Sequence, residues 1–230
     1  MGILYIIATP IGNLKDITIR ALEILKEVDF ILCEDQRVTR KLLTHYQINA
    51  QTLSYHQHSK SQKLHHIINL LQNGKKIALV SDSGTPSISD PGGKLVEMVT
   101  EELKNIKIIP IPGPSAVTAA ASISGIAMEK FLFLGFPPAK KKRKKFFTEV
   151  VNSKYPVIFY ESPHRILKTL RELYALYTEY KIQNTKLVVC RELTKKFETI
   201  YRGEIEKVLE ELKRDEIKGE FVVVTHAKQQ

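Results

Sequence analysis

The sequence has only two cysteines, Cys33 and Cys190, and no run approaching the ~20 apolar residues that span a bilayer. A small disulfide-stapled fold is therefore excluded, and distant cysteines within apolar segments are typical of a reduced, intracellular protein. Residues 1–8 carry no charged leader and run directly into Thr9 and Pro10, which predicts a first buried strand instead of a signal peptide. We therefore expect a cytoplasmic protein without a membrane anchor.

The composition is that of a globular protein. Hydrophobic residues make up 43% of the 230 residues and charged residues 26%, and the length suits one large domain or two small ones. The net charge is +10, and six of the cations lie in one run, residues 140–145. Such a run favours a polyanionic partner, more often nucleic acid than a membrane, although a solvated surface loop is the alternative.

Short apolar runs alternate with helical patterns through the first half of the chain. Strands are predicted over residues 3–8, 29–33, 77–81 and 106–111. Apolar residues recur at helical spacing over residues 21–28, after the possible caps Asp16 and Thr18, and over residues 64–71. Because the strands lack polar alternation, both of their faces are buried, which predicts a parallel sheet covered by helices.

The pattern changes around Phe136, Pro137 and Pro138, just before the basic run. Beyond it we predict strands over residues 156–161, 186–191, 199–203 and 220–225, and helices over residues 165–177 and 205–213. A short turn precedes residues 197–203, which permits antiparallel pairing. The predicted fold class is α/β with two α/β domains: residues 1–113 with a mostly parallel sheet, and residues 114–230 with a mixed sheet.

Two glycine- and proline-containing loops follow predicted strands directly, at residues 9–14 and 81–93. Ligands of open α/β sheets bind beyond the carboxyl ends of strands. The second loop contains Asp82 and Asp90, with no cation before Lys94, so it favours a neutral or cationic small molecule over a nucleoside triphosphate. No dinucleotide or P-loop glycine fingerprint is present. The alternative to a ligand-binding role is a plain turn for residues 9–14 and a structural loop for residues 81–93.

Two further segments carry polar or small residues at strand ends. Residues 111–117 form a proline-glycine turn that opens an alanine-rich helix. In residues 159–165, Glu161, His164 and Arg165 either contact a partner or form a cluster at a helix start. No histidine has a cysteine or carboxylate at zinc-like spacing, so no metal is expected, and no serine-hydrolase elbow occurs.

Together these segments resemble the tetrapyrrole methylase superfamily, the class III S-adenosylmethionine methyltransferases. The resemblance spans residue 3 to about residue 225. The matching segments are residues 4–14, 81–92, 112–116, 133–136 and 160–165. Two departures from the family pattern are Gln36, where threonine is usual, and Pro137, where leucine is usual. The resemblance implies a cofactor cleft between two domains and a homodimer.

The branch of the superfamily that the sequence resembles implies methyl transfer from S-adenosylmethionine to the ribose 2′-hydroxyl of a cytidine in the decoding region of 16S ribosomal RNA. The implied cofactor-binding residues are Pro10, Ile11, Asp82, Ser83, Gly84, Thr85, Ile88, Ser115, Ala116 and Tyr160. A protonated ribose hydroxyl is a poor nucleophile, so a general base is expected, with Asp82, Glu34 and Asp35 as candidates. The expected RNA-binding residues are Arg37, Lys140, Lys141, Lys142, Arg143, Lys144, Lys145, His164 and Arg165.

Two other functions remain open at this stage. The basic run would also attract the carboxylates of a precorrin-like tetrapyrrole, and a non-catalytic RNA-binding protein on the same fold would carry the same charges. The transfer of label from the cofactor to small ribosomal subunits or to uroporphyrinogen distinguishes an RNA methyltransferase from a tetrapyrrole methyltransferase. Calorimetric binding of S-adenosylmethionine distinguishes a methyltransferase from a non-catalytic RNA-binding protein.

Overall fold

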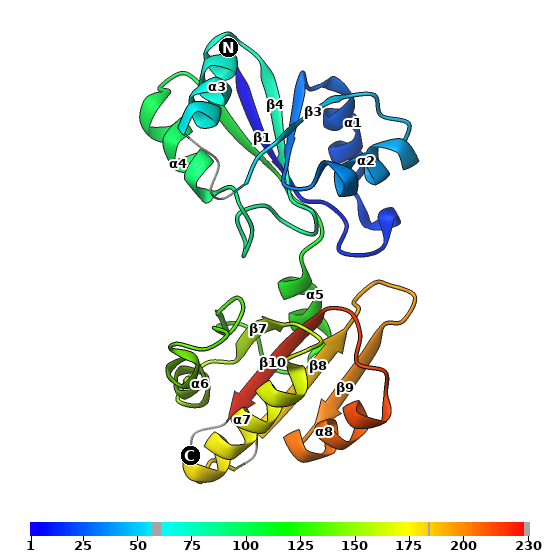
Figure 1. Ribbon diagram of the computed structural model, residues 1–230, viewed down its shortest axis with the longest axis vertical. Coiled ribbons are helices and arrows are strands. Elements are labelled where there is room, and N and C mark those ends of the chain that lie inside the picture. Colours follow the sequence, from blue (N-terminus) through cyan, green and yellow to red (C-terminus); the bar gives the residue numbers. More distant parts are fainter. Residues whose placement is uncertain (57–60, 184, 228–230) are drawn as a thin grey trace. The chain divides into compact units, whose positions relative to one another are not determined.

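The computed structural model describes residues 1–56, 61–183 and 185–227. The chain divides into two compact units, Met1–Ser115 and Ala116–Gln230 (Figure 1). Each unit contains one five-stranded sheet with its own helices. None of the helices in the described ranges is long and apolar enough to cross a membrane.

The first unit is built on a parallel sheet in the order β3-β2-β4-β1-β5. Its strands are β1 (Ile3–Ile7), β2 (Phe30–Cys33), β3 (Gln51–Ser54), β4 (Lys76–Val80) and β5 (Lys107–Ile111). Its helices are the 3₁₀ turn η1 (Leu14–Asp16), α1 (Ile19–Glu27), α2 (Gln36–His45), α3 (Ser61–Gln72) and α4 (Gly93–Glu102). Thr18 caps α1 by accepting the backbone N–H of Ala21. The predicted parallel sheet is confirmed.

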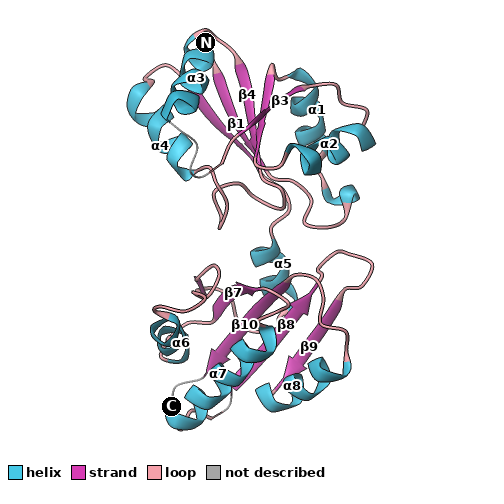
Figure 2. Cartoon of the chain, in the orientation of Figure 1, coloured by secondary structure: helices cyan, strands magenta, loops and turns pink. Residues whose placement is uncertain are grey.

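Helices cover both faces of this sheet, as Figure 2 shows. Leu25 of α1 and Leu42 of α2 pack with Ile7 on one face, whereas α3 and α4 pack with Leu4 on the other. Alternate strand residues therefore enter two separate cores, which explains why the strands have no polar side. Ile7 is in register with Val80 and with Ile111, so three parallel strands end level with one another.

The second unit has a mixed sheet in the order β6-β7-β10-β8-β9. Its strands are β6 (Leu132–Phe133), β7 (Val157–Glu161), β8 (Thr185–Arg191), β9 (Thr199–Gly203) and β10 (Phe221–Ala227). Its helices are α5 (Ala116–Ile123), α6 (Arg143–Val151), α7 (Ile166–Glu179) and α8 (Ile205–Arg214). Among the described strands of this unit, only β6 and β7 pair in parallel, while β9 pairs antiparallel with β8, as predicted. Helices α6, α7 and α8 share one core with the sheet.

Candidate functional site

The loops that follow β1, β4 and β5 are joined to one another at the carboxyl edge of the first unit's sheet. Thr9 and Gly84 exchange two backbone hydrogen bonds, of 2.9 and 3.1 Å. The Thr9 hydroxyl donates to the Ser81 carbonyl at 2.9 Å, and the Thr85 hydroxyl donates to the Pro114 carbonyl at 3.2 Å. Three loops that are distant in sequence therefore meet beyond the strand ends, where ligands of open α/β sheets bind.

Two glycines lie where these loops approach one another. Gly84 has a φ of +82°, and a Cβ placed on it would lie 3.4 Å from Cγ2 of Ile11 and 3.7 Å from the Pro114 oxygen. A Cβ on Gly113 would lie 3.1 Å from that of Ala8. The backbone conformation at Gly84 is one that a residue with a side chain rarely adopts. Both glycines thus lie where the loops after β1, β4 and β5 meet.

The loop after β4 is folded on its own polar side chains. The Ser81 hydroxyl donates to Oδ2 of Asp90 at 2.6 Å and accepts the Ser83 N–H at 3.0 Å. Ser87 and Ser89 both have positive φ, of 71° and 59°. Strained backbone of this kind is retained where the surrounding structure fixes it, and it concentrates at ligand sites.

The predicted cofactor residues divide between the two units. Pro10 and Ile11 are buried, Asp82, Thr85 and Ser115 are half-buried, and Ser83 and Ile88 are exposed. All of these belong to the first unit, together with Gly84, whereas Ala116 and Tyr160 belong to the second. The structure therefore brings the first-unit residues to one edge of one sheet.

Three carboxylates lie at the ends of β2 and β4. Oδ1 of Asp82 accepts the backbone N–H of Asp35 at 3.1 Å, which ties the two strand ends together. Asp35 also caps α2, where its carboxylate accepts the Arg37 N–H at 2.8 Å and pairs with the Arg37 guanidinium at 2.7 Å. These hydrogen bonds, the side-chain one first, lower the pKa of Asp35 to about 2. Asp35 is therefore a helix cap and a very weak base.

Glu34 has the opposite electrostatic setting. Burial raises the pKa of Glu34, and the negative charges of Asp82 and Asp90 raise it further. A general base works best when its pKa is near the operating pH. Glu34 is thus better suited than Asp35 to act as the predicted general base.

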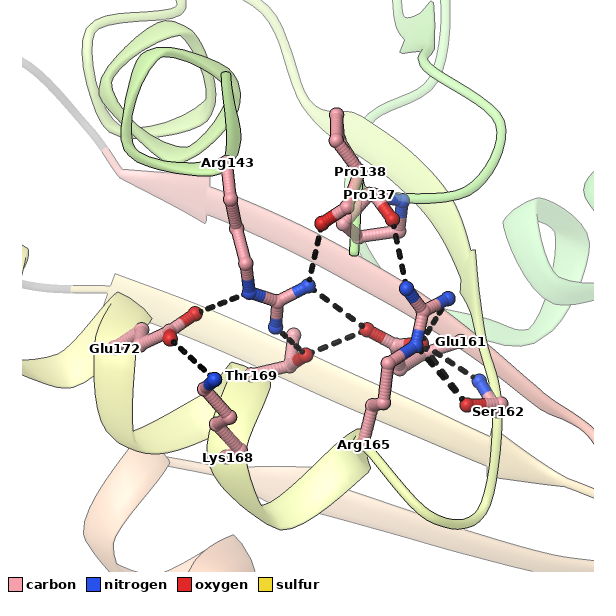
Figure 3. A network of polar contacts seen from close by, with 9 residues as sticks. All are labelled: Pro137, Pro138, Arg143, Glu161, Ser162, Arg165, Lys168, Thr169 and Glu172. Carbon is pink, nitrogen blue, oxygen red and sulfur yellow. Dashed lines mark hydrogen bonds and ion pairs between the residues drawn. The ribbon is translucent and has the colours of Figure 1, made fainter. Parts of the chain in front are cut away.

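The second unit contains a buried polar network around Glu161, the last residue of β7 (Figure 3). One carboxylate oxygen pairs with Nη2 of Arg165 at 2.8 Å and accepts the Ser162 N–H at 2.8 Å. The other accepts the Thr169 hydroxyl at 2.5 Å and lies 3.8 Å from Nη1 of Arg143. The Thr169 oxygen in turn accepts Nη2 of Arg143 at 2.5 Å. Of the two alternatives for this segment, the structure therefore contains the polar cluster at a helix start.

The structure places two of the predicted RNA-binding residues in this network. Arg143 is only 6% exposed and forms a 2.7 Å ion pair with Glu172, because it begins α6 and turns inward toward α7. Arg165 is half-buried and paired with Glu161, so neither guanidinium is a free surface cation. Sequence reasoning missed Thr169 and Glu172, which carry no signal beyond their helical spacing.

The remaining predicted RNA-binding side chains lie at the surface. They are Arg37, Lys140, Lys141, Lys142, Lys144, Lys145 and His164. The Arg37 charge is partly neutralised by its ion pair with Asp35. Beside the basic run, Phe136 is 53% exposed and its ring centroid lies 5.3 Å from that of Tyr160. Among the described residues, no group of three or more histidine, cysteine or acidic side chains is placed to hold a metal ion.

Comparison with known proteins identifies the family. The sequence profile described as Tetrapyrrole (Corrin/Porphyrin) Methylases matches residues 3–209. The chain belongs to this family of S-adenosylmethionine-dependent methyltransferases. The resemblance drawn from the loop segments and the predicted fold class are both confirmed.

Relatives match nearly the whole chain. A protein of Thermotoga maritima named ribosomal RNA small subunit methyltransferase I is 41% identical over 100% of both chains. A protein of the same name from Halalkalibacterium halodurans is 44% identical over 97% of this chain and 75% of its own length. The solved structure of a cobalt precorrin-4 methyltransferase superposes with a TM-score of 0.69 over 97% of this chain and 94% of its own, at 20% identity, and thus shares the fold.

Proposed function

We propose that this methyltransferase transfers the methyl group of S-adenosylmethionine to the ribose 2′-hydroxyl of a cytidine in the decoding region of 16S ribosomal RNA. The observation that carries the proposal is the near full-length match, at 41% and 44% identity, to proteins named ribosomal RNA small subunit methyltransferase I. The exposed lysines of the second unit support an RNA substrate, because cations that contact phosphates give affinity without reading sequence.

The joined loops of the first unit fit the chemistry of the proposed cofactor. The sulfonium cation of S-adenosylmethionine tolerates nearby carboxylates such as Asp82. The adenosine and methionine parts of the cofactor form hydrogen bonds with main-chain groups. Gly113 is exposed at this edge and has no side chain over its main chain. We assign the cofactor to Pro10, Ile11, Asp82, Ser83, Gly84, Thr85, Ile88 and Ser115, and retain Ala116 and Tyr160 of the second unit as predicted contacts.

Bound S-adenosylmethionine supplies an electrophilic methyl group, and the protein must position and deprotonate the acceptor. Methyl transfer is an in-line displacement, so alignment of the ribose oxygen with the methyl carbon lowers the barrier. We assign the general base to Glu34, because its pKa is raised. Asp82 holds the backbone of Asp35 and thereby the position of the adjacent Glu34.

The RNA-binding side chains of this proposal are the five exposed lysines of the basic run, with His164 and Arg37 as further contacts. Neutralised phosphates release counterions, so binding should weaken steeply as salt rises. An RNA substrate assembled in ribosomes places the reaction in the cytoplasm. We also propose a homodimer, as the family resemblance implies.

The test is methyl transfer from labelled S-adenosylmethionine to isolated small ribosomal subunits and, in parallel, to uroporphyrinogen. Mapping of ribose methylation on 16S RNA should locate one labelled cytidine in the decoding region. If only uroporphyrinogen became labelled, the proposed RNA substrate would be wrong and the enzyme would act on a tetrapyrrole. Absence of a calorimetric binding signal with S-adenosylmethionine would instead favour a non-catalytic RNA-binding protein.

A further inference from the structure

The basic run is not uniform, because its single arginine faces the protein interior. Arg143 is 6% exposed, whereas the lysines before and after it are exposed. Lys142 precedes it in the left-handed conformation, with a φ of 66°, and Arg143 is the first residue of α6. The run thus contains one internal cation and five external ones, and the turn at Lys142 leads into the helix that begins with Arg143.

Arg143 and Arg165 hold two successive carbonyls of the segment that leads into the run. Nη1 of Arg143 donates to the Pro138 oxygen at 3.1 Å, and Nη1 of Arg165 donates to the Pro137 oxygen at 3.0 Å (Figure 3). Proline has no backbone N–H, so this dipeptide can be tied down through its main chain only at its carbonyls. Charged donors make stronger hydrogen bonds to carbonyls than neutral donors do.

Carboxylates balance the charges of both guanidiniums. The Glu161 side chain is fully buried and pairs with Arg165, and Glu172 pairs with Arg143. Thr169 joins the two halves, since its hydroxyl donates to Glu161 while its oxygen accepts from Arg143. Loss of any one partner would leave a buried charge or donor unsatisfied.

The network therefore holds the basic run on both sides of its first three lysines. Lys140, Lys141 and Lys142 lie between the held carbonyl of Pro138 and the buried Arg143, and two more lysines follow on α6. Cations on a fixed segment lose less conformational entropy when they bind phosphates than cations on a loose one.

We infer that Arg143 and Glu161 are positioning residues for RNA binding, which hold the lysine segment in its binding conformation without contacting the phosphates themselves. The inference rests on the proposed function and deepens it. Arginine is required at this position because its planar fork reaches Glu172, Thr169 and the Pro138 carbonyl at once, which the ammonium group of lysine does not.

The decisive comparison is Arg143→Lys, which keeps the charge, against Lys144→Gln, which removes one exposed charge from the same run. Arg143→Lys should raise the KM for 16S RNA in small subunits by about tenfold, with kcat and the KM for S-adenosylmethionine within about twofold of wild type. The slope of log affinity against log salt should stay unchanged, because the same phosphates are neutralised. Lys144→Gln should instead reduce that slope by about 0.7–0.9.

A second variant, Thr169→Val, removes the shared hydroxyl and leaves every charge in place. It should reproduce the effect of Arg143→Lys on the RNA KM. In both variants, amide hydrogen exchange of residues 139–145 should become faster without RNA present, whereas Lys144→Gln should leave this exchange at the wild-type rate.

Wild-type RNA affinity in Arg143→Lys and Thr169→Val would overturn the inference, as would an equal loss of affinity for S-adenosylmethionine and RNA, which indicates general loss of structure. Unchanged amide exchange in both variants would also overturn it. Failure of the wild-type protein to methylate 16S RNA would refute the proposed function instead, so the two failures are distinguishable.

Discussion

Gly84→Ala tests whether the joined loops of the first unit form the cofactor site. The added Cβ would lie 3.4 Å from Cγ2 of Ile11, which is ordinary van der Waals contact, so the space tolerates it. The cost arises from the backbone, because a φ of +82° is unfavourable for alanine by about 1–2 kcal/mol. Relaxation of Gly84 would weaken its hydrogen bonds to Thr9.

The expected results are a loss of about 1–2 kcal/mol in the free energy of unfolding and, at 1.4 kcal/mol per factor of ten, up to about 25-fold weaker binding of S-adenosylmethionine. Unfolding is followed in urea by circular dichroism, since the sequence has no tryptophan, and binding is measured by calorimetry.

Gly93→Ala is the matched control, because a Cβ there meets no atom within 4 Å and the residue begins α4. It should bind the cofactor normally and should not lose stability, since alanine favours helix more than glycine does. Wild-type cofactor affinity in Gly84→Ala, or an equal loss in Gly93→Ala, would refute the reasoning.

Three further predictions concern single side chains. Glu34→Gln should slow methyl transfer and abolish the rise in wild-type rate with pH, because Glu34 accepts a proton only above its raised pKa; a parallel pH profile in the variant would exclude it as the base. Lys141→Gln should reduce the salt dependence of RNA affinity by about 0.7–0.9 in log–log slope and leave cofactor affinity unchanged, as filter binding at several salt concentrations would show. Tyr177, whose pKa burial raises to about 12, shares a buried 2.9 Å hydrogen bond with Thr225. Its neutral form is favoured in the folded state, so it contributes to a fall in wild-type stability as pH rises from about 10 toward 12. Tyr177→Phe should show a smaller fall and be less stable by ~1–2 kcal/mol at neutral pH, measured by urea unfolding.

The sequence predicted the elements whose physical signal is local. The strands of the first unit have continuous apolar runs because both faces are covered, and the loops after them stand out by their glycine and proline content. By contrast, β3 was not predicted: it pairs only with β2, at the sheet edge, and its polar residues show no buried pattern. Helix α2 was also missed, since only Thr39, Leu42 and Leu43 are buried in it.

Arg143 could not be distinguished from its neighbours by sequence alone. A run of six cations has the same local pattern whichever member is internal, and the partners that decide the matter, Glu161 and Glu172, come much later in the chain. The pairing of these residues depends on how α6 packs against α7, which is a tertiary contact. For the same reason, the contrast between Asp35, held by Arg37, and Glu34 emerges only from the folded arrangement.

The two proposed binding sites depend on separate sets of contacts, and this separation predicts additivity. The ties around Gly84 lie within the first unit, and the network around Arg143 lies within the second, with no residue in common. Mutational effects at sites without shared partners usually add within about 0.3–0.5 kcal/mol. The double variant Gly84→Ala with Arg143→Lys should therefore show the cofactor affinity of the first change and the RNA affinity of the second. A cofactor affinity in the double variant that differs by more than this from that of Gly84→Ala alone would mean that the RNA-binding segment and the cofactor loops are energetically coupled.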